Sequence, residues 1–455
     1  MANMLDYLDW FGDVSFTGFA FNEVDNLILA QLSYLDFASC APSATPTAQD
    51  TLEAVSTKYF ASHTKEQLYE ASGFVSTYTS FLLQKAATSK RFKNVLVGFY
   101  QEKNNPHTQE QFGAVTFALP DGSYYVAFRG TDGTIHGWRE DLNISFQTVA
   151  AQIDALEYLS HIAVHVAGKF HVGGHSKGGN LAAYAVALAH PSVQKRVSKL
   201  WCNDAPGFLE DVVPFSKLTA LVDKTVLLTP EYCIVSGLMH HAATPQIIHA
   251  QTPDADIMQH DAFTWQILGP RFVRSQSPSV AAQHVCSLLN DVVEKRTKDE
   301  RKHFADMLFG CIEASGATTT NELASTGAEG IRKIWEAVNA LDDPDKAVIF
   351  EFIKALIGQM VSDSLMPLNK SVAQSLQQIS VPSTNYEELL NSPTPPSIEE
   401  MHEYKERKRR AAAAAVPAKL VEKVWPPKQL LIGQGANEKD SASKPDSSHD
   451  ADIPT

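Results

Sequence analysis

The sequence predicts an α/β fold in which a largely parallel sheet is flanked by helices. Strand-like and helix-like segments alternate over residues 1–285, the pattern expected of parallel strands joined by crossover helices. Residues 153–166 have helical apolar spacing, residues 170–173 are β-prone, and the alanine-rich residues 180–189 favour a second helix. A Gly-x-Ser-x-Gly turn joins this strand to the second helix. Together these segments predict a β-α-β unit at the centre of the sheet.

The strand that completes this unit belongs to a predicted hairpin. Residues 112–119 and 123–128 are rich in apolar and aromatic residues, and the turn Pro120-Asp121-Gly122 separates them. Such a turn between two apolar runs is typical of a β-hairpin. The hairpin therefore leads into the helix over 153–166.

The sequence Gly174-His-Ser-Lys-Gly-Gly179 is the strongest functional signal. In the α/β-hydrolase fold, this strand–turn–helix context raises a nucleophilic serine on a strained backbone. Gly-x-Ser-x-Gly also occurs by chance, but here a strand precedes it and a helix former follows it. We therefore predict an α/β-hydrolase fold with Ser176 as the nucleophile.

An acyl-transfer site also needs donors for the oxyanion of the tetrahedral intermediate. One expected donor is the backbone N–H of Lys177, the residue after the nucleophile. Arg129-Gly130-Thr131 follows the strand over 123–128, so Thr131 is the candidate for the second donor. A simple tight turn is the alternative interpretation of this segment.

These motifs resemble those of the class-3 (fungal-type) lipases. The shared segments are Phe128-Arg-Gly-Thr131, Trp138-Arg-Glu-Asp-Leu142 and the serine turn. The resemblance implies that Thr131 supplies the oxyanion hole and that Asp141 steadies the Thr131 side chain. Lys177 departs from the leucine usual in these lipases, which bears on substrate preference because the oxyanion needs only its backbone N–H.

The chain resembles more closely the Mbeg-like family of uncharacterised bacterial proteins. This resemblance covers residues 1–310 and implies an α/β-hydrolase fold, but it implies no substrate. The motifs that carry it are Phe21-Asn-Glu-Val-Asp-Asn26, Gly174-His-Ser-Lys-Gly-Gly-Asn180, Asn203-Asp-Ala-Pro-Gly-Phe208 and Gln259-His-Asp-Ala-Phe-Thr-Trp265.

A serine nucleophile needs a histidine base, and in this fold the base follows the serine and the acid in the chain. Our candidate is His260, which follows a polar loop and precedes the aromatic segment 263–265. A loop histidine after the last core strand is free to approach the serine. The pair His240-His241 is the runner-up, and Asp261 has the simpler role of a helix N-cap. The other histidines after Ser176 are His190, His249, His284, His303, His402 and His449.

Two carboxylates compete for the role of the triad acid. Asp204 follows the strand over 200–203, and Glu231 follows the strand over 225–229. Either carboxylate could orient the histidine and stabilise its protonated form. The later position is the usual one, some lipases use the earlier one, and Asp204 could instead be a turn residue in Asn-Asp-Ala-Pro-Gly. We favour Asp204 and keep Glu231 as the alternative.

Composition agrees with a folded enzyme of the cytoplasm. The chain has 455 residues, of which 44% are hydrophobic, and a net charge of -14 that argues against nucleic acid as a partner. Its five cysteines have no Cys-x-x-Cys spacing, as expected of reduced thiols. The first residues form no secretory signal, and no apolar run reaches membrane-spanning length.

The sequence predicts three regions. They are an α/β-hydrolase domain over 1–285, a helical accessory region over 286–365, and a mostly disordered Pro-, Ser- and charge-rich tail over 366–455. The basic run within 405–410 is either a solvated helix face or a surface that binds an acidic partner, such as another protein, or a membrane.

No motif predicts a cofactor or a metal. Nucleotide-binding glycine motifs are missing from the sequence. His161 and His165 have the spacing of metal ligands, but they lack a third ligand nearby and are expected on a helix surface.

We therefore expect a serine hydrolase that cleaves a small-molecule or lipid carboxylic ester through a Ser-His-acid triad. The alternatives are a hydrolase-like scaffold that binds without turnover and an acyltransferase that uses the same serine.

Overall fold

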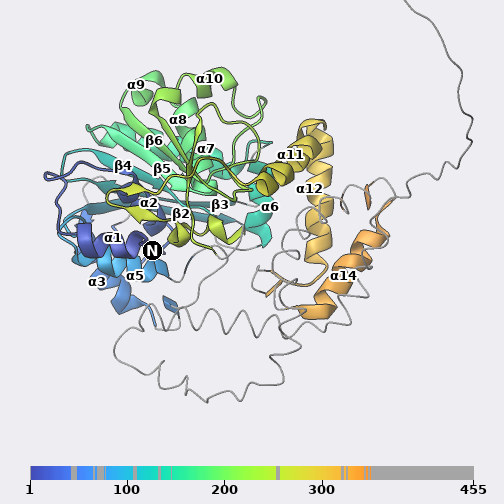
Figure 1. Cartoon of the computed structure of the whole chain (residues 1–455), viewed down its shortest axis with the longest axis horizontal. Helices are drawn as coiled ribbons and strands as arrows, with labels where there is room; N and C mark the ends of the chain where they lie inside the picture. The colour runs from blue at the N-terminus through green and yellow to red at the C-terminus, as the bar shows by residue number, and fades with distance from the viewer. Residues whose placement is uncertain are drawn as a thin grey trace, which may run out of the picture. The chain divides into compact units, whose positions relative to one another are not determined.

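The computed structural model describes most of the chain up to residue 349 (Figure 1). The described residues are 2–42, 49–64, 67–68, 76, 78–105, 110–131, 135–144, 146–252, 257–318, 322–323, 326–342, 345–346 and 349. The chain divides into two compact units, residues 1–401 and 402–455, and every described residue lies in the first. The tail expected over 366–455 falls outside the described residues. No helix in the described part is long and apolar enough to cross a membrane.

Eight strands form one sheet, in which the order of the strands follows their order in the chain. They are β1 (Gln49–Thr51), β2 (Leu96–Asn105), β3 (Glu110–Ala118), β4 (Tyr124–Phe128), β5 (Phe170–His175), β6 (Val197–Asn203), β7 (Thr225–Pro230) and β8 (Pro245–Ile248). Strands β1 to β4 pair antiparallel, and each neighbouring pair from β4 to β8 is parallel. The α/β class and the β3–β4 hairpin are confirmed, whereas the antiparallel edge formed by β1 and β2 was not predicted.

Helices α7 (Ala150–His165) and α8 (Lys177–Leu188) flank β5, as the sequence predicted. The other α-helices are α1 (Met4–Phe11), α2 (Glu23–Leu32), α3 (Leu52–Ser62), α5 (Tyr78–Thr88), α6 (Ile135–Ile144), α9 (Pro191–Gln194), α10 (Phe215–Thr219), α11 (Val280–Glu294), α12 (Lys298–Glu313) and α14 (Gly327–Ala340). The short elements are the 3₁₀ helices η1 (Val222–Lys224), η2 (Ile257–His260) and η3 (Ala262–Thr264) and a two-stranded sheet of β9 (Ile267–Leu268) and β10 (Arg271–Phe272).

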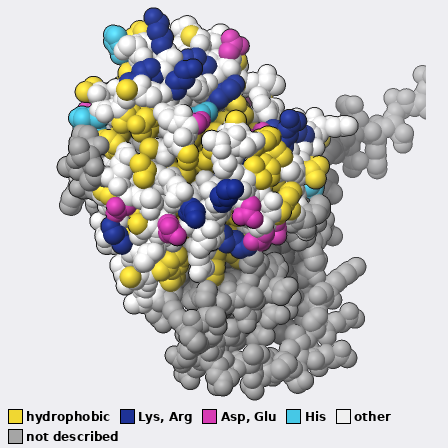
Figure 2. All heavy atoms as spheres, turned by 90° about the vertical axis from the view of Figure 1, so that its left-hand side faces the viewer, with side chains coloured by type: hydrophobic (Ala, Val, Ile, Leu, Met, Phe, Trp, Pro, Cys, Tyr) yellow, Lys and Arg dark blue, Asp and Glu magenta, His cyan; other side chains and the backbone are white. Residues whose placement is uncertain are grey.

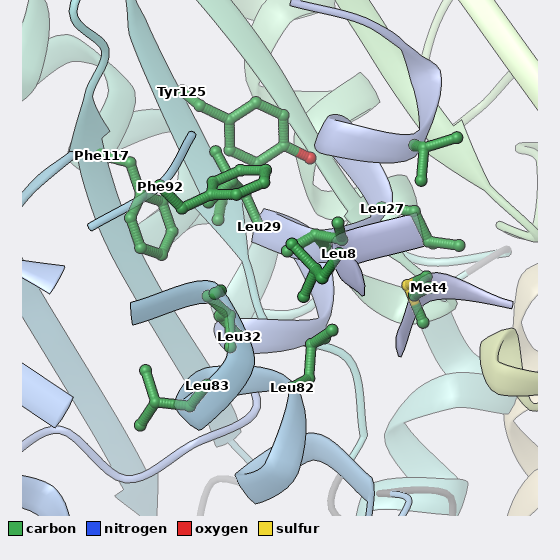
Figure 3. Packing of buried hydrophobic residues seen from close by; sticks show 14 of the residues in the cluster. Met4, Leu8, Leu27, Leu29, Leu32, Leu82, Leu83, Phe92, Phe117 and Tyr125 are labelled. Atoms are coloured by element: carbon green, nitrogen blue, oxygen red, sulfur yellow. The ribbon is translucent and has the colours of Figure 1, made fainter. Parts of the chain in front are cut away.

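Helices cover both faces of the sheet. Along β4, Tyr125 and Ala127 pack into a core with residues of α1, α2, α3 and α5, whereas Val126 and Phe128 pack into a second core with residues of α7 and α8. This alternation is the two-residue period of a strand that is buried on both faces. Figure 3 shows the first core, where Leu8, Leu27 and Leu82 from three helices lie to one side of the aromatic rings.

A buried ion pair joins α2 to the turn between α5 and β2. Asp25 of α2 and Arg91 are both fully buried and paired, and Tyr7 of α1 donates a 2.9 Å hydrogen bond to the same carboxylate. The Arg91 guanidinium also donates to the carbonyl oxygens of Val14 and Phe19 at 2.8 and 3.0 Å. These bonds compensate the burial of the charge, and they explain why the segment 21–26 holds polar residues inside a core.

Helix α12 packs against α6. Ile135 of α6 shares a hydrophobic cluster with Phe304 and Leu308 of α12, and Arg139 of α6 pairs with Asp306 of α12. Helix α11 already begins at Val280, inside the region expected to end at 285.

On the face shown in Figure 2, Lys and Arg side chains lie among Asp, Glu and apolar side chains. The net charge of -14 therefore does not make this face uniformly acidic.

Candidate active site

Ser176 lies in a strained turn between β5 and α8. Its backbone angles are φ 57° and ψ −131°, a conformation that a non-glycine residue adopts only when its surroundings impose it. Its N–H donates to the carbonyl oxygen of Asn203 at the end of β6, at 2.9 Å. The turn therefore holds the serine at the carboxyl edge of the parallel strands, where open α/β sheets bind ligands.

Two glycines let the end of β4 approach this turn. A Cβ atom on Gly178 would lie 2.1 Å from the carbonyl oxygen of Phe128, and one on Gly130 would lie 2.8 Å from that of His175. Both distances are far below a van der Waals contact. Only glycine therefore allows Thr131, at the end of β4, to lie beside the serine turn.

Asp204 and His260 form a buried hydrogen-bonded pair. The distance between His260 Nδ1 and Asp204 Oδ2 is 2.7 Å, and the exposed fractions of the two residues are 4% and 1%. Asp204 directly follows β6 and has a positive φ of 46°. Burial by itself would raise the pKa of this carboxyl, but His260, Cys233 and His175 hold it below its ordinary value. Asp204 is therefore ionised, and it accepts a hydrogen bond from His260 Nδ1.

His175 and Tyr34 support His260 from the other side. His175 Nε2 donates to the carbonyl oxygen of His260 at 2.9 Å, and the two rings lie 4.6 Å apart between centroids. Burial and the neighbouring His260 lower the pKa of His175 to about 3, so His175 is neutral and its Nδ1 accepts from the Tyr34 hydroxyl at 3.0 Å. The residue before the nucleophile thereby fixes the backbone of the candidate base.

Ser176 Oγ makes no hydrogen bond to His260 or to any other described residue. In the absence of substrate, the bond between a catalytic nucleophile and its base is often long and tightens only in the complex. The arrangement thus brings His260 to the serine turn, but it contains no hydrogen bond between His260 and Ser176 Oγ.

The sequence placed His260 in an open loop, but the structure does not. His260 ends the 3₁₀ helix η2, and the neighbouring Gln259 is held at both ends. The Gln259 side chain accepts from Tyr232 N at 2.7 Å, and its carbonyl oxygen accepts from Trp265 Nε1 at 2.8 Å. Asp261 caps the following turn by accepting from Phe263 N at 3.0 Å, so the aromatic segment anchors the base.

The other candidate acid lies in a different pair. Glu231 accepts from His249 Nδ1 at 2.7 Å and from the hydroxyl of Ser275. The side chains of Glu231 and His249 are 30% and 37% exposed. Of the two carboxylates, only Asp204 is hydrogen-bonded to His260 in the described part of the chain.

Neither runner-up histidine is hydrogen-bonded to Asp204 or His260 in the described part of the chain. His240 Nε2 is 3.1 Å from a carboxylate oxygen of Glu294. Burial lowers the pKa of His241 to about 4. The rings of His161 and His165 lie 4.1 Å apart between centroids and are tilted by 42°. The described residues contain no group of three side chains that could hold a metal ion.

Thr131 and Asp141 are in contact at the end of β4. The Thr131 hydroxyl donates to the Asp141 carboxylate, with 2.5 and 2.6 Å to its two oxygens. Burial raises the pKa of Asp141 to about 6, and the charge of Lys177 opposes this rise. With Asp141 ionised, the hydroxyl proton of Thr131 is engaged. The backbone N–H groups of Thr131 and Lys177 donate to no described residue, so both are available to an oxyanion.

Lys177 extends away from the serine and into a buried ion pair. Its Nζ lies 2.6 Å from Glu140 Oε2 and 2.8 Å from the carbonyl oxygen of Gln111. The side chains of Lys177 and Glu140 are 1% and 2% exposed. Glu140 precedes Asp141 in α6, so this pair connects the serine helix to the helix that bears the oxyanion support.

A polar network behind the turn was not predicted. Asn203 Nδ2 donates to the carbonyl oxygen of Gly174, and Asn26 Nδ2 donates to Asn203 Oδ1, at 3.0 and 2.8 Å. The Tyr125 hydroxyl donates to Asn26 Oδ1 at 2.7 Å. Nothing local in the sequence links these residues, because Asn26 and Asn203 are 177 positions apart.

A family model described as Mbeg1-like matches residues 86–310. The chain is similar to that family over a range that contains Thr131, Asp141, Ser176, Asp204 and His260. A search of curated proteins found no match.

Proposed function

We propose that this protein is a serine hydrolase that cleaves a carboxylic ester of a small molecule or lipid. The observation that carries the proposal is the buried Asp204–His260 pair held against the strained Ser176 turn. In this function, Ser176 Oγ attacks the acyl carbon while His260 Nε2 takes its proton. The same proton then goes to the leaving alcohol, and water, deprotonated by His260, releases the acid and restores Ser176.

The electrostatics of the site support these roles. Asp204 is ionised and would stabilise the imidazolium of His260. The free N–H groups of Thr131 and Lys177 would hold the oxyanion. Asp141 occupies the hydroxyl of Thr131, which favours the backbone N–H over the hydroxyl as the donor from that residue.

A scaffold that binds a ligand without turnover is the competing function. The observation that favours the scaffold is the missing hydrogen bond between Ser176 Oγ and His260. The two functions differ in whether the serine is nucleophilic, which can be measured without knowing the substrate.

The test is covalent labelling with a fluorophosphonate, read by intact mass. The wild type should gain one adduct, and Ser176→Ala and His260→Ala should gain none. Asp204→Asn should slow labelling by about two to four orders of magnitude. The matched control Glu231→Gln should label at nearly the wild-type rate.

Two results would count against the proposal. A folded wild-type protein that gains no adduct favours the scaffold. An adduct that persists in Ser176→Ala would place the reactive group elsewhere.

A further inference from the structure

The loop after β7 wraps around the far side of the Asp204 carboxylate. Asp204 Oδ2 faces His260, whereas Oδ1 accepts two hydrogen bonds from this loop, one from the Cys233 thiol and one from Ser236 N at 3.2 Å. Cys233 is the only side chain other than that of His260 to donate to this carboxylate in the described part of the chain.

The thiol is held in place by its own neighbours. Ser236 N lies 3.0 Å from Cys233 Sγ, and Ser236 Oγ lies 2.8 Å from it. Ser236 Oγ also donates to Thr229 Oγ1 of β7 at 3.1 Å. The thiol therefore has one defined position, from which its proton points to Asp204.

The Cys233 thiol is protonated at neutral pH and is therefore a hydrogen-bond donor. Burial, and then the negative charge of Asp204, raise the pKa of the thiol well above its ordinary value. A second cysteine fixes the backbone of the loop, because Cys286 Sγ of α11 donates to the carbonyl oxygen of Cys233 at 3.4 Å. Cys286 thus contacts the loop without contacting the carboxylate.

We propose that Cys233 is a positioning residue for the triad acid. Its thiol donates to Asp204 Oδ1 and so holds Oδ2 toward His260. This inference rests on the proposed hydrolase function, since it concerns how that site is oriented. Cys233 does not touch the reacting atoms, so its effect passes entirely through Asp204.

Substitution of Cys233 by a residue without a donor should also change the proton affinity of His260. A carboxylate that loses one donor interacts more strongly with its remaining partners, here Ser236 N and His260, and so favours imidazolium at His260. Activity that needs neutral His260 should then begin at a higher pH. The other titratable groups that surround this pair are His175, His241, Cys286 and Asp141, and all of them are retained in the variants.

The experiment measures the rate of fluorophosphonate labelling against pH in the full-length protein. Cys233→Ala should lower the maximal rate about tenfold, the scale of a hydrogen bond to a charged group, and should move the acid limb to higher pH. Cys233→Ser restores a donor and should label within about threefold of the wild type. Cys40→Ala removes a buried thiol far along the chain and serves as the control, with an unchanged rate and limb. If Cys233→Ala does not fold, Cys233→Val provides the variant without a donor.

A second readout separates this inference from the proposed function. The proton on His260 Nδ1 should give a low-field resonance in ¹⁵N-histidine-labelled protein, whether or not the serine reacts. This resonance should shift in Cys233→Ala and return toward its original position in Cys233→Ser. A wild type that is not labelled would defeat the hydrolase proposal, whereas an unchanged resonance and an unchanged acid limb in Cys233→Ala would overturn the role of Cys233.

Discussion

The buried Lys177–Glu140 pair makes a sharp prediction about stability. Lys177→Met keeps most of the volume of the side chain but removes the charge that faces Glu140. Glu140 Oε2 then loses its partner at 2.6 Å, and Glu140 Oε1 already has no hydrogen-bond partner among the described residues. The variant therefore leaves an uncompensated carboxylate in the protein interior.

The magnitude follows from the distance and the burial. Two unit charges 2.6 Å apart attract by about 6 kcal/mol at an effective dielectric constant of about 20. Desolvation of both ions offsets much of this attraction in the intact pair, so breaking one side costs about 3–5 kcal/mol. Replacing both partners removes both penalties. Lys177→Met/Glu140→Gln should therefore be about as stable as the wild type.

The assay is urea unfolding of the wild type, the two single variants and the double variant at neutral pH. Midpoints are compared at a common m-value to give the free energy of unfolding, and the four values give the coupling energy of the pair. A loss below about 1 kcal/mol in Lys177→Met would refute the reasoning. A double variant as unstable as that single variant would refute it equally.

Three further predictions concern other contacts. Gly178→Ala should lose about 1–3 kcal/mol of stability by overpacking against β4, whereas Gly310→Ala, in a helix with open space around it, should gain up to about 1 kcal/mol. Thermal and urea unfolding measure both variants. Asp25→Leu should cost about 3–5 kcal/mol because Arg91 is left unpaired and buried, and urea unfolding of Asp25→Leu/Arg91→Leu should recover part of this loss. The pKa of His175 falls from its ordinary 6.5 to about 3 on folding, so the unfolded chain binds more protons between these values. Stability should therefore fall as the pH is lowered from 6.5 to 3, by about 1.4 kcal/mol per pH unit. Urea unfolding of His175→Asn should show a flatter dependence over pH 3–6.5, and an equal slope would contradict the neutral state of His175.

The sequence was enough to predict strands and helices where local patterns agree with the geometry of the fold. Apolar runs, the Pro120–Gly122 turn and the alanine-rich helix predicted β3 to β7 and the helices α7 and α8, because these elements are buried and their periodicity is strong. Strand β2 has polar residues over 101–105, and β1 has three residues, each only partly buried. Their pairing at the edge of the sheet depends on tertiary contacts that composition does not encode.

The candidate site could be predicted as a set of residues but not as an arrangement. Asp204 and Glu231 both follow parallel strands, and their partners differ only because the side chains reach different histidines. The supporting contacts of Tyr34, His175 and Cys233 join residues between 29 and 141 positions apart. Gly130 and Gly178 belong to the motifs, but the sequence does not show why glycine is needed there. The need arises from the close approach of β4 to the serine turn, which exists only in the folded chain.

Helix α6 connects α12 to the candidate site. This helix carries Glu140, which pairs with Lys177, and Asp141, which holds Thr131. Its opposite contacts are with α12, through the hydrophobic cluster of Ile135 and the ion pair of Arg139. Any displacement of α12 would therefore move the element that fixes both candidate oxyanion donors. On these contacts α12 supports α6, and through α6 it supports the residues that hold Thr131 and Lys177.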